Sequence, residues 1–207
     1  MKRRLMALEK SGGGLPSSYT AVDYLQSTGA QWIEMGVAPN QNTKAVLKIK
    51  INTFTSRGAS LIGSRTDINS DDQFTTYLDD YGGTRFLFRM DGQPKTTSWT
   101  GLTTNKIYIV TLSGTEMKAE LEDGTAVFSK TFSVPDFTST VTMALFRSKG
   151  VSGAYFQGRI YSCKHYSGDE LIQDFVPCLD TDSVPCMFDL VSRKPFYNVG
   201  TGSFTWG

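Results

Sequence analysis

The most restrictive feature of this sequence is a two-residue alternation of apolar and polar side chains, which recurs along most of the chain. In residues 46–51, Leu47, Ile49 and Ile51 fall on one side and Lys48 and Lys50 on the other. Successive side chains of a β-strand point to opposite faces, so this spacing predicts strands that are buried on one face. Similar runs occupy residues 85–90, 106–112, 117–121, 127–132, 141–146 and 155–166.

Turn-forming residues separate these runs. Asp123 and Gly124 lie between two of them, and an Asp-Gly pair is a strong hairpin signal. Beyond the first ten residues no stretch carries a helical stripe, and no repeat with a period of roughly 20–50 residues is present, which excludes propellers and solenoids. We therefore expect an all-β sandwich or barrel of about ten strands.

One run changes phase within itself. Its inward positions are first even-numbered and then odd-numbered: Phe156, Gly158, Ile160, Cys163 and His165. Such a change predicts a β-bulge near Tyr161 and Ser162. It also places His165 on the core face, where we expect it to be satisfied by packing and one hydrogen bond rather than to be catalytic.

Composition excludes several classes of protein. The chain has 207 residues, of which 39% are hydrophobic, so it is long enough for one substantial core and too apolar for a disordered protein. Its 21 basic and 20 acidic residues leave a net charge of +1, too little for a general nucleic-acid binder. No apolar run approaches the roughly 20 residues of a membrane span.

The N-terminal segment differs from the rest. Leu5, Met6 and Leu8 form a partial apolar stripe on a short predicted helix, which ends at three glycines before residue 15. The segment lacks the apolar stretch of a signal peptide. We expect residues 1–14 to be an arm and hinge that docks on another protein or on a second copy of this chain; a self-packed arm is the alternative.

The three cysteines do not form a recognisable framework. Cys163, Cys178 and Cys186 are an odd number at spacings that fit neither a disulfide scaffold nor a zinc site. Cys178 and Cys186 could bridge a short loop, but we expect them to be small buried residues.

Four short motifs resemble, in their order and spacing, the concanavalin A-like, laminin-G-type jelly rolls: LIGSR at 61–65, IYIVTL at 107–112, LEDG at 121–124 and FQGRI at 156–160. The two ends of the domain are similar to laminin-G-like domains of phage and prophage structural proteins of gut bacteria. These stretches are YLQSTGAQWIEMGV at 24–37, DFVPCLDTDSVPCMFDL at 174–190 and FYNVGTG at 196–202. Glu34 and Met35 depart from that group, which typically has Asp-Thr there.

The resemblance implies a two-sheet antiparallel jelly-roll sandwich over residues 15–207. It also implies a role as a virion surface, tail-fibre or adhesin module. Related jelly rolls include glycoside hydrolases, whose activity requires a pair of carboxylates at a defined separation. Glu116, Glu120 and Glu122 share one side of a strand, but that side lies opposite an apolar face, so we expect them on a solvated outer surface and expect no catalytic residues.

Two further kinds of site were considered. Asp67, Asn69 and Asp71 alternate as in calcium loops, yet the pattern is not an EF-hand. We expect an ordinary acidic loop and no cofactor, with a looser calcium site as the alternative. For sugar binding, exposed aromatic rings beside polar groups are required. The candidates are Trp99, Tyr77, Tyr81, Asp79 and Asp80, whereas Trp32, Phe86, Phe88 and Phe156 are assigned to the core.

We therefore expect a non-enzymatic phage virion structural or adhesion protein, such as a capsid decoration, head-fibre or tail-fibre module. Its partners would be other virion proteins or copies of itself, engaged through the arm, and host surface glycans, with no nucleic acid and no membrane. It would be made in the host bacterial cytoplasm and act on the virion. The alternative is a stand-alone carbohydrate-binding lectin domain of a bacterial or prophage surface protein; a glycoside hydrolase is the least expected.

Overall fold

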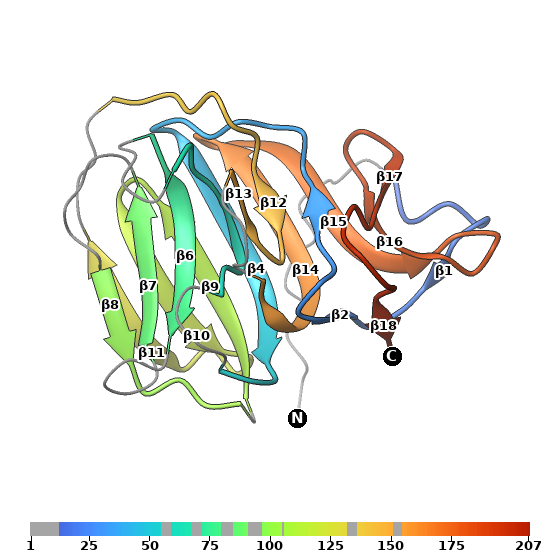
Figure 1. Ribbon diagram of the computed structural model, residues 1–207, viewed down its shortest axis with the longest axis horizontal. Helices are drawn as coiled ribbons and strands as arrows, with labels where there is room; N and C mark the ends of the chain where they lie inside the picture. The colour runs from blue at the N-terminus through green and yellow to red at the C-terminus, as the bar shows by residue number, and fades with distance from the viewer. Residues whose placement is uncertain are drawn as a thin grey trace.

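The computed structural model describes residues 13–54, 59–67, 72–79, 85–90, 97–104, 106–131, 136–150 and 155–207. Within these ranges the chain forms strands and no helix, arranged in two packed layers (Figure 1). The predicted all-β jelly-roll sandwich is confirmed. The predicted helical arm, with Leu5, Met6 and Leu8, lies outside the described residues.

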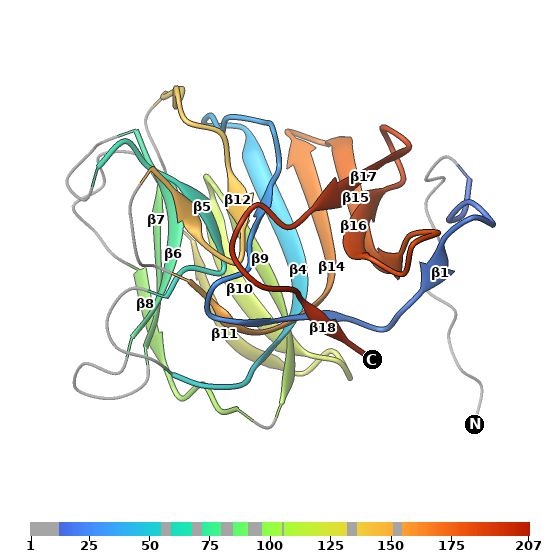
Figure 2. The same ribbon diagram turned by 45° about the vertical axis from the view of Figure 1, so that its right-hand side comes forward.

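The larger layer is an antiparallel sheet with the order β11-β10-β9-β4-β14-β15-β16-β17, to which β1, β2 and β18 add at one side. Its central strands are β4 (Thr43–Ile51), β9 (Ile107–Ser113), β14 (Gln157–Ser167) and β15 (Glu170–Leu179). The others are β1 (Thr20–Ala21), β2 (Leu25–Thr28), β10 (Glu116–Leu121), β11 (Ala126–Thr131), β16 (Pro185–Asp189), β17 (Lys194–Tyr197) and β18 (Thr205–Trp206). β18 pairs with β2 and β1 pairs with β15, so segments from both ends of the domain close this sheet (Figure 2).

The smaller layer has a three-stranded part and a four-stranded part. The first consists of β6 (Phe74–Asp79), β7 (Arg85–Met90) and β8 (Thr97–Thr100); the second consists of β3 (Ile33–Glu34), β5 (Ile62–Ser64), β12 (Ala144–Leu145) and β13 (Ser148–Lys149). Thr76 joins the two parts, because its hydroxyl oxygen accepts hydrogen bonds from the backbone N–H groups of Leu61 and Ile62 at 3.0 and 3.2 Å.

One strand pair departs from the predicted antiparallel arrangement, since β13 runs parallel to β5. β12 runs antiparallel to β5 along one of its edges. The chain then turns around the first residue of β5 and continues as β13 along the opposite edge of β5. Phe146 makes this corner with a φ of 66°, and its N–H donates to the carbonyl of Leu61 at 2.8 Å. The Phe146 side chain is buried, which holds the corner against the core.

The main core lies between the two layers. Every second residue of β4 is buried, as the alternation predicted, and Phe86, Phe88 and Phe156 are buried as well. Trp32 differs from these three, because it is only partly buried, although it packs against the same core. It directly precedes β3, where the neighbouring Ile33 takes the fully buried position.

Both predictions about residues 155–166 are confirmed. The register between β14 and β4 shifts between Ile160 and Ser162, so the bulge lies at Tyr161. His165 is 1% exposed, and its Nδ1 lies 3.1 Å from the Oε1 of Gln173. The predicted hairpin is also present, with Gly124 at a φ of 84° between β10 and β11.

A second, smaller core lies beside β15 and β16. Cys178, Cys186 and Phe188 are buried there, and Leu15 and Tyr19 of the N-terminal segment pack against them. The two cysteines face each other across the strands with their sulfur atoms 3.5 Å apart and are not bridged. This placement agrees with their interpretation as small buried residues.

Candidate functional site

Two short strands of the smaller layer bring aromatic and charged side chains to one outer surface. Glu34 belongs to β3 and Trp32 directly precedes that strand, whereas Lys149 belongs to β13 and Arg147 directly precedes it; the members of each pair are two residues apart, so each pair projects to one side. Trp32 contacts Arg147, and Glu34 contacts Lys149. In Figure 1, β12 and β13 lie in the nearer layer. We call this surface the front-face cluster, and its six partly exposed members are Trp32, Glu34, Thr142, Arg147, Lys149 and Tyr155.

Arg147 is held by two aromatic rings. Its guanidinium carbon lies 4.7 Å from the centre of the Trp32 ring and 5.1 Å from that of Tyr155. Its Nε also donates to the carbonyl of Ser148 at 3.3 Å. Cation–π contacts of this kind favour a fixed orientation of the planar group. The front-face cluster therefore presents oriented N–H donors beside apolar ring surface.

Glu34, Thr142 and Lys149 form a hydrogen-bonded triad next to this stack. The Lys149 ammonium donates to the Glu34 carboxylate and, at 2.7 Å, to the Thr142 hydroxyl, which in turn donates to Glu34 at 2.9 Å. These hydrogen bonds lower the pKa of Glu34 below its ordinary value of 4.5, so the carboxylate is ionised at neutral pH. The Glu34 side chain is 37% exposed. A charged acceptor and a charged donor thus stand side by side at the surface.

Three buried polar atoms on β5, β13 and the residue after β5 have no hydrogen-bond partner among the residues that the structure describes. They are the Oγ atoms of Ser64 and Ser148 and the Nε of Arg65. Arg65 is 4% exposed, and its backbone N–H donates to the carbonyl of Lys149 at 3.0 Å, which places it at the end of the β5–β13 pair. Native proteins seldom leave such atoms unpaired, and water or a ligand usually satisfies them.

Tyr77 is the predicted site residue that the structure brings to this region. The Arg65 guanidinium donates to its hydroxyl and lies 5.0 Å from its ring centre, and the hydroxyl donates to Gln73 at 3.3 Å. Tyr77 is partly exposed on β6. The other residues that the sequence predicts for sugar binding are not tested in this way. Asp79 belongs to β6 and Trp99 to β8, but the structure describes only their backbone. Asp80 and Tyr81 lie outside the described residues.

The alternative calcium loop stays a prediction, because Asn69 and Asp71 lie outside the described residues. No group of three or more His, Cys, Asp or Glu side chains that could hold a metal ion occurs within the described ranges. No helix long and apolar enough to cross a membrane occurs in that part of the chain either.

The three glutamates considered for hydrolysis lie on β10 and just beyond it, in the other layer. Met117 and Ala119 of β10 are buried, so the outer-face placement of Glu116 and Glu120 is confirmed. The Nζ of Lys118 lies 2.7 Å from the Oε1 of Glu120, and the Nζ of Lys48 lies 2.7 Å from the Oε1 of Glu122. Two of the three glutamates therefore form salt bridges on this face.

Sequence reasoning missed most of the front-face cluster. Trp32 was assigned to the core, and Arg65, Arg147, Lys149 and Tyr155 were not singled out. The available signal was the spacing of an aromatic and a charged residue at Trp32 and Glu34. It was obscured because β3 and β13 are two residues long and show no alternation.

No family model and no curated protein sequence matches the chain. Among solved structures, a putative carbohydrate binding protein from Bacteroides ovatus ATCC 8483 is similar with a TM-score of 0.61 and 13% identity, over 91% of this chain and 60% of that one. The SAP-like pentraxin from Limulus polyphemus is similar with a TM-score of 0.50 and 11% identity, over 94% of this chain and 97% of that one. The chain thus spans 60% of the length of the Bacteroides protein. At these identities the similarity is one of fold, the jelly-roll sandwich described above.

Proposed function

We propose that this chain is a non-catalytic carbohydrate-binding domain that holds its ligand at the front-face cluster. The observation that carries the proposal is the Trp32–Arg147–Tyr155 stack beside the triad of Glu34, Thr142 and Lys149. The likeness in fold to a putative carbohydrate binding protein supports it. Of the two functions expected from the sequence, we therefore favour the lectin domain over the virion structural protein.

The chemistry of the cluster suits a sugar. A pyranose ring offers C–H faces that pack on aromatic rings, here Trp32 and Tyr155, and hydroxyl groups that both donate and accept. Arg147 and Lys149 donate, and the ionised Glu34 accepts, so neighbouring hydroxyls of one sugar would find complementary partners. Arg65 adjoins Lys149 of this surface through its backbone, and a bridging water would satisfy its Nε, which has no partner among the described residues.

Arg147→Ala tests the proposal, after a glycan array has identified a ligand for the full-length wild type. The substitution removes the oriented donor of the stack, so we expect affinity for that ligand to fall by about tenfold or more. Glu34→Gln should weaken binding in the same direction, because it removes the charged acceptor. Isothermal titration calorimetry measures both.

The matched control is Glu122→Gln, an exposed carboxylate on the other layer, which should leave binding unchanged. Circular dichroism of each variant reports whether it is folded. A wild type that binds no glycan, or a folded Arg147→Ala variant with unchanged affinity, would overturn the assignment. Trp99→Ala tests the different site that the sequence predicts at Trp99, Tyr77, Tyr81, Asp79 and Asp80: loss of glycan binding in a folded Trp99→Ala variant would place the ligand there and not at the front-face cluster.

We also propose that residues 1–14 anchor the domain to a virion, in keeping with the virion surface, tail-fibre or adhesin role that the resemblance of residues 24–37, 174–190 and 196–202 implies. Supporting this, the hinge is held at a defined point on the domain: Nη1 of Arg193 donates to the carbonyls of Gly13 and Gly14 at 3.0 and 2.7 Å.

A further inference from the structure

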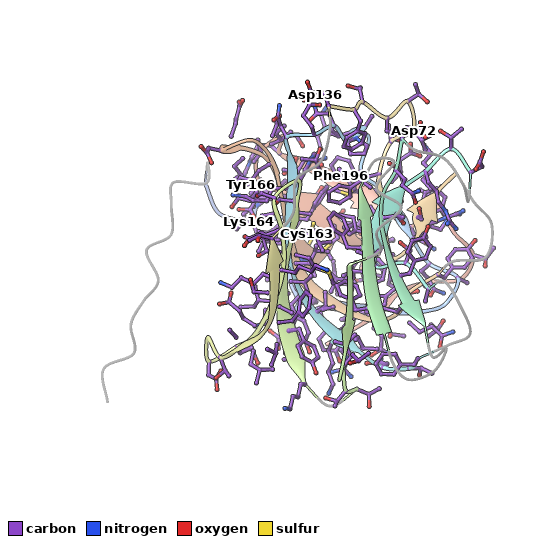
Figure 3. The ribbon with its side chains drawn as sticks, turned by 90° about the vertical axis from the view of Figure 1, so that its left-hand side faces the viewer. Asp72, Asp136, Cys163, Lys164, Tyr166 and Phe196 are labelled. Atoms are coloured by element: carbon purple, nitrogen blue, oxygen red, sulfur yellow. The ribbon has the colours of Figure 1, made fainter. Side chains whose placement is uncertain are left out.

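The outer face of the large sheet carries a second group of charged and aromatic side chains. Lys44, Lys48 and Lys50 are partly exposed along β4, alternating with buried residues. Figure 3 shows Lys164 and Tyr166 of β14 on the outer side of this sheet and Cys163 on its inner side. We call this surface the back-face strip, and its members are Tyr24, Lys44, Lys48, Lys50, Arg159, Tyr161, Lys164 and Tyr166, all partly exposed.

The strip contains two cations placed directly against each other. Lys50 of β4 is opposite Arg159 of β14 in the register of the sheet. Like charges at directly opposed positions destabilise a sheet. On its other side Arg159 is opposite Gln26 of β2, which is neutral. The Nε of Arg159 donates to the Oε1 of Gln26 at 2.8 Å. The sheet therefore carries an electrostatic cost at this point that an anionic ligand would remove.

Charge on the strip is only partly balanced. Lys48 is 2.7 Å from Glu122, and Lys164 is 3.3 Å from Asp174. Lys44, Lys50 and Arg159 make no salt bridge within the described part of the chain. The whole chain has a net charge of only +1, so this excess is local. Lys44 and Lys50 are six residues apart, or about 20 Å along an extended strand, which is the length of several sugar units.

Aromatic rings lie among these cations. The Nζ of Lys44 is 4.4 Å from the ring centre of Tyr166, and the guanidinium of Arg159 is 4.1 Å from that of Tyr24. Tyr24 also meets Tyr161 edge-on at 5.4 Å. Tyr161 is the extra residue of the bulge, and both it and Ser162 are partly exposed, so the bulge adds a ring to this face.

We propose that the back-face strip binds an acidic polysaccharide, at a site separate from the front-face cluster. Carboxylate or sulfate groups of the polymer pair with Lys44, Lys50 and Arg159, and its sugar rings pack against the tyrosines. A chain of sugars carrying regularly spaced anions matches both the row of cations and the interleaved rings. A neutral glycan would leave Lys50 and Arg159 opposed and unpaired.

The test uses oligogalacturonate as the acidic probe and its fully methyl-esterified form as the neutral one. The full-length double variant Lys50→Gln/Arg159→Gln removes both unpaired charges. We expect its affinity for oligogalacturonate to fall by about tenfold or more, while affinity for the front-face ligand is unchanged. Without ligand, the single variant Lys50→Gln, which keeps the contacts of Arg159 with Gln26 and Tyr24, should melt at a higher temperature than the wild type because the opposed charges are gone. Binding by the wild type should weaken as salt is added.

Lys118→Gln is the matched control, because Lys118 is on the same sheet face but is paired with Glu120. It should bind oligogalacturonate as the wild type does. Unchanged affinity in the double variant, or equal binding of the methyl-esterified probe, would overturn the proposal. A single-stranded DNA oligonucleotide provides a further test. If it binds more tightly than oligogalacturonate and its binding is lost in the double variant, the strip is a nucleic-acid site and the proposal is overturned. The two proposals can fail independently: if Arg147→Ala loses the front-face ligand but still binds oligogalacturonate, the proposal for the back-face strip is supported.

Discussion

The neighbours of the buried His165 determine which of its two ring nitrogens carries the proton. The side-chain amide of Gln173 donates to the carbonyl of Met35 at 2.8 Å, which turns its Oε1 toward His165 as an acceptor. The Nδ1 of His165 must then carry the proton. Burial lowers the pKa of His165 below 6.5, although the hydrogen bond to Gln173 opposes this shift. His165 is therefore neutral in the folded protein near neutral pH.

This arrangement predicts a loss of stability in mild acid. In the unfolded chain His165 takes up a proton as the pH falls through 6.5, whereas in the folded chain it does so only at lower pH. The free energy of unfolding should therefore decrease as the pH drops below 6.5, down to the lowered pKa. Urea unfolding at about pH 7.5 and about pH 5.5 measures this. His165→Gln, which has no titrating group, should show a smaller decrease; equal decreases in the two proteins would contradict the account.

At the scale of elements, a single glycine sets the distance between β5 and β6. A Cβ atom on Gly63 would lie 2.6 Å from the hydroxyl oxygen of Thr75 and 2.7 Å from the carbonyl oxygen of Phe74. Only glycine permits this approach. Since β5 pairs with β13, the position of Lys149 depends on the same contact.

We therefore predict that Gly63→Ala destabilises the protein by roughly 1–3 kcal/mol, as overpacking does. It should also weaken glycan binding at the front-face cluster, because β13 would shift with β5. Denaturant unfolding and calorimetry check the two effects. Gly14→Ala is the control, because a Cβ there would meet nothing within 4 Å, and it should leave both unchanged. A Gly63→Ala protein as stable as the wild type would show that β5 can move away freely.

The same elements mark how far the sequence predicts this structure. Long, half-buried strands such as β4 and β14 repeat their pattern often enough to show phase, so even the bulge at Tyr161 was predictable. The strands β3, β5, β12 and β13 have two or three residues each, and β5 and β12 are buried on both sides. Tertiary contacts position such strands, so the front-face cluster that they support could not be predicted, and the exposed part of Trp32 was missed.

At the scale of the whole molecule, the two proposed sites lie on the outer faces of opposite layers. The front-face cluster belongs to β3 and β13 of the smaller layer, and the back-face strip to β4 and β14 of the larger one. The core separates them, so substitutions in one should not alter the other. A single domain could therefore hold two glycan chains at once.

The N-terminal arm carries the remaining prediction at this scale. If residues 1–14 dock on a second copy, Leu5→Asp/Leu8→Asp should reduce the mass of the full-length protein in solution, because charged residues cannot occupy an apolar contact. Light scattering measures this, and Lys10→Gln on the same segment is the control. Equal masses for wild type and double variant would remove self-association from the roles of the arm.

The closure of the large sheet by β1, β2 and β18 has a consequence for how the domain is made. Thr205 pairs with Gln26, so β2 receives one of its hydrogen-bonding partners from the opposite end of the domain, which is synthesised much later than β2. In the same way, β1 can pair only after β15 has been synthesised. Contacts between segments so distant in sequence slow folding, and unpaired strand edges favour aggregation. Translation speed and chaperone supply, more than the final stability of the sandwich, should therefore set the yield of native protein.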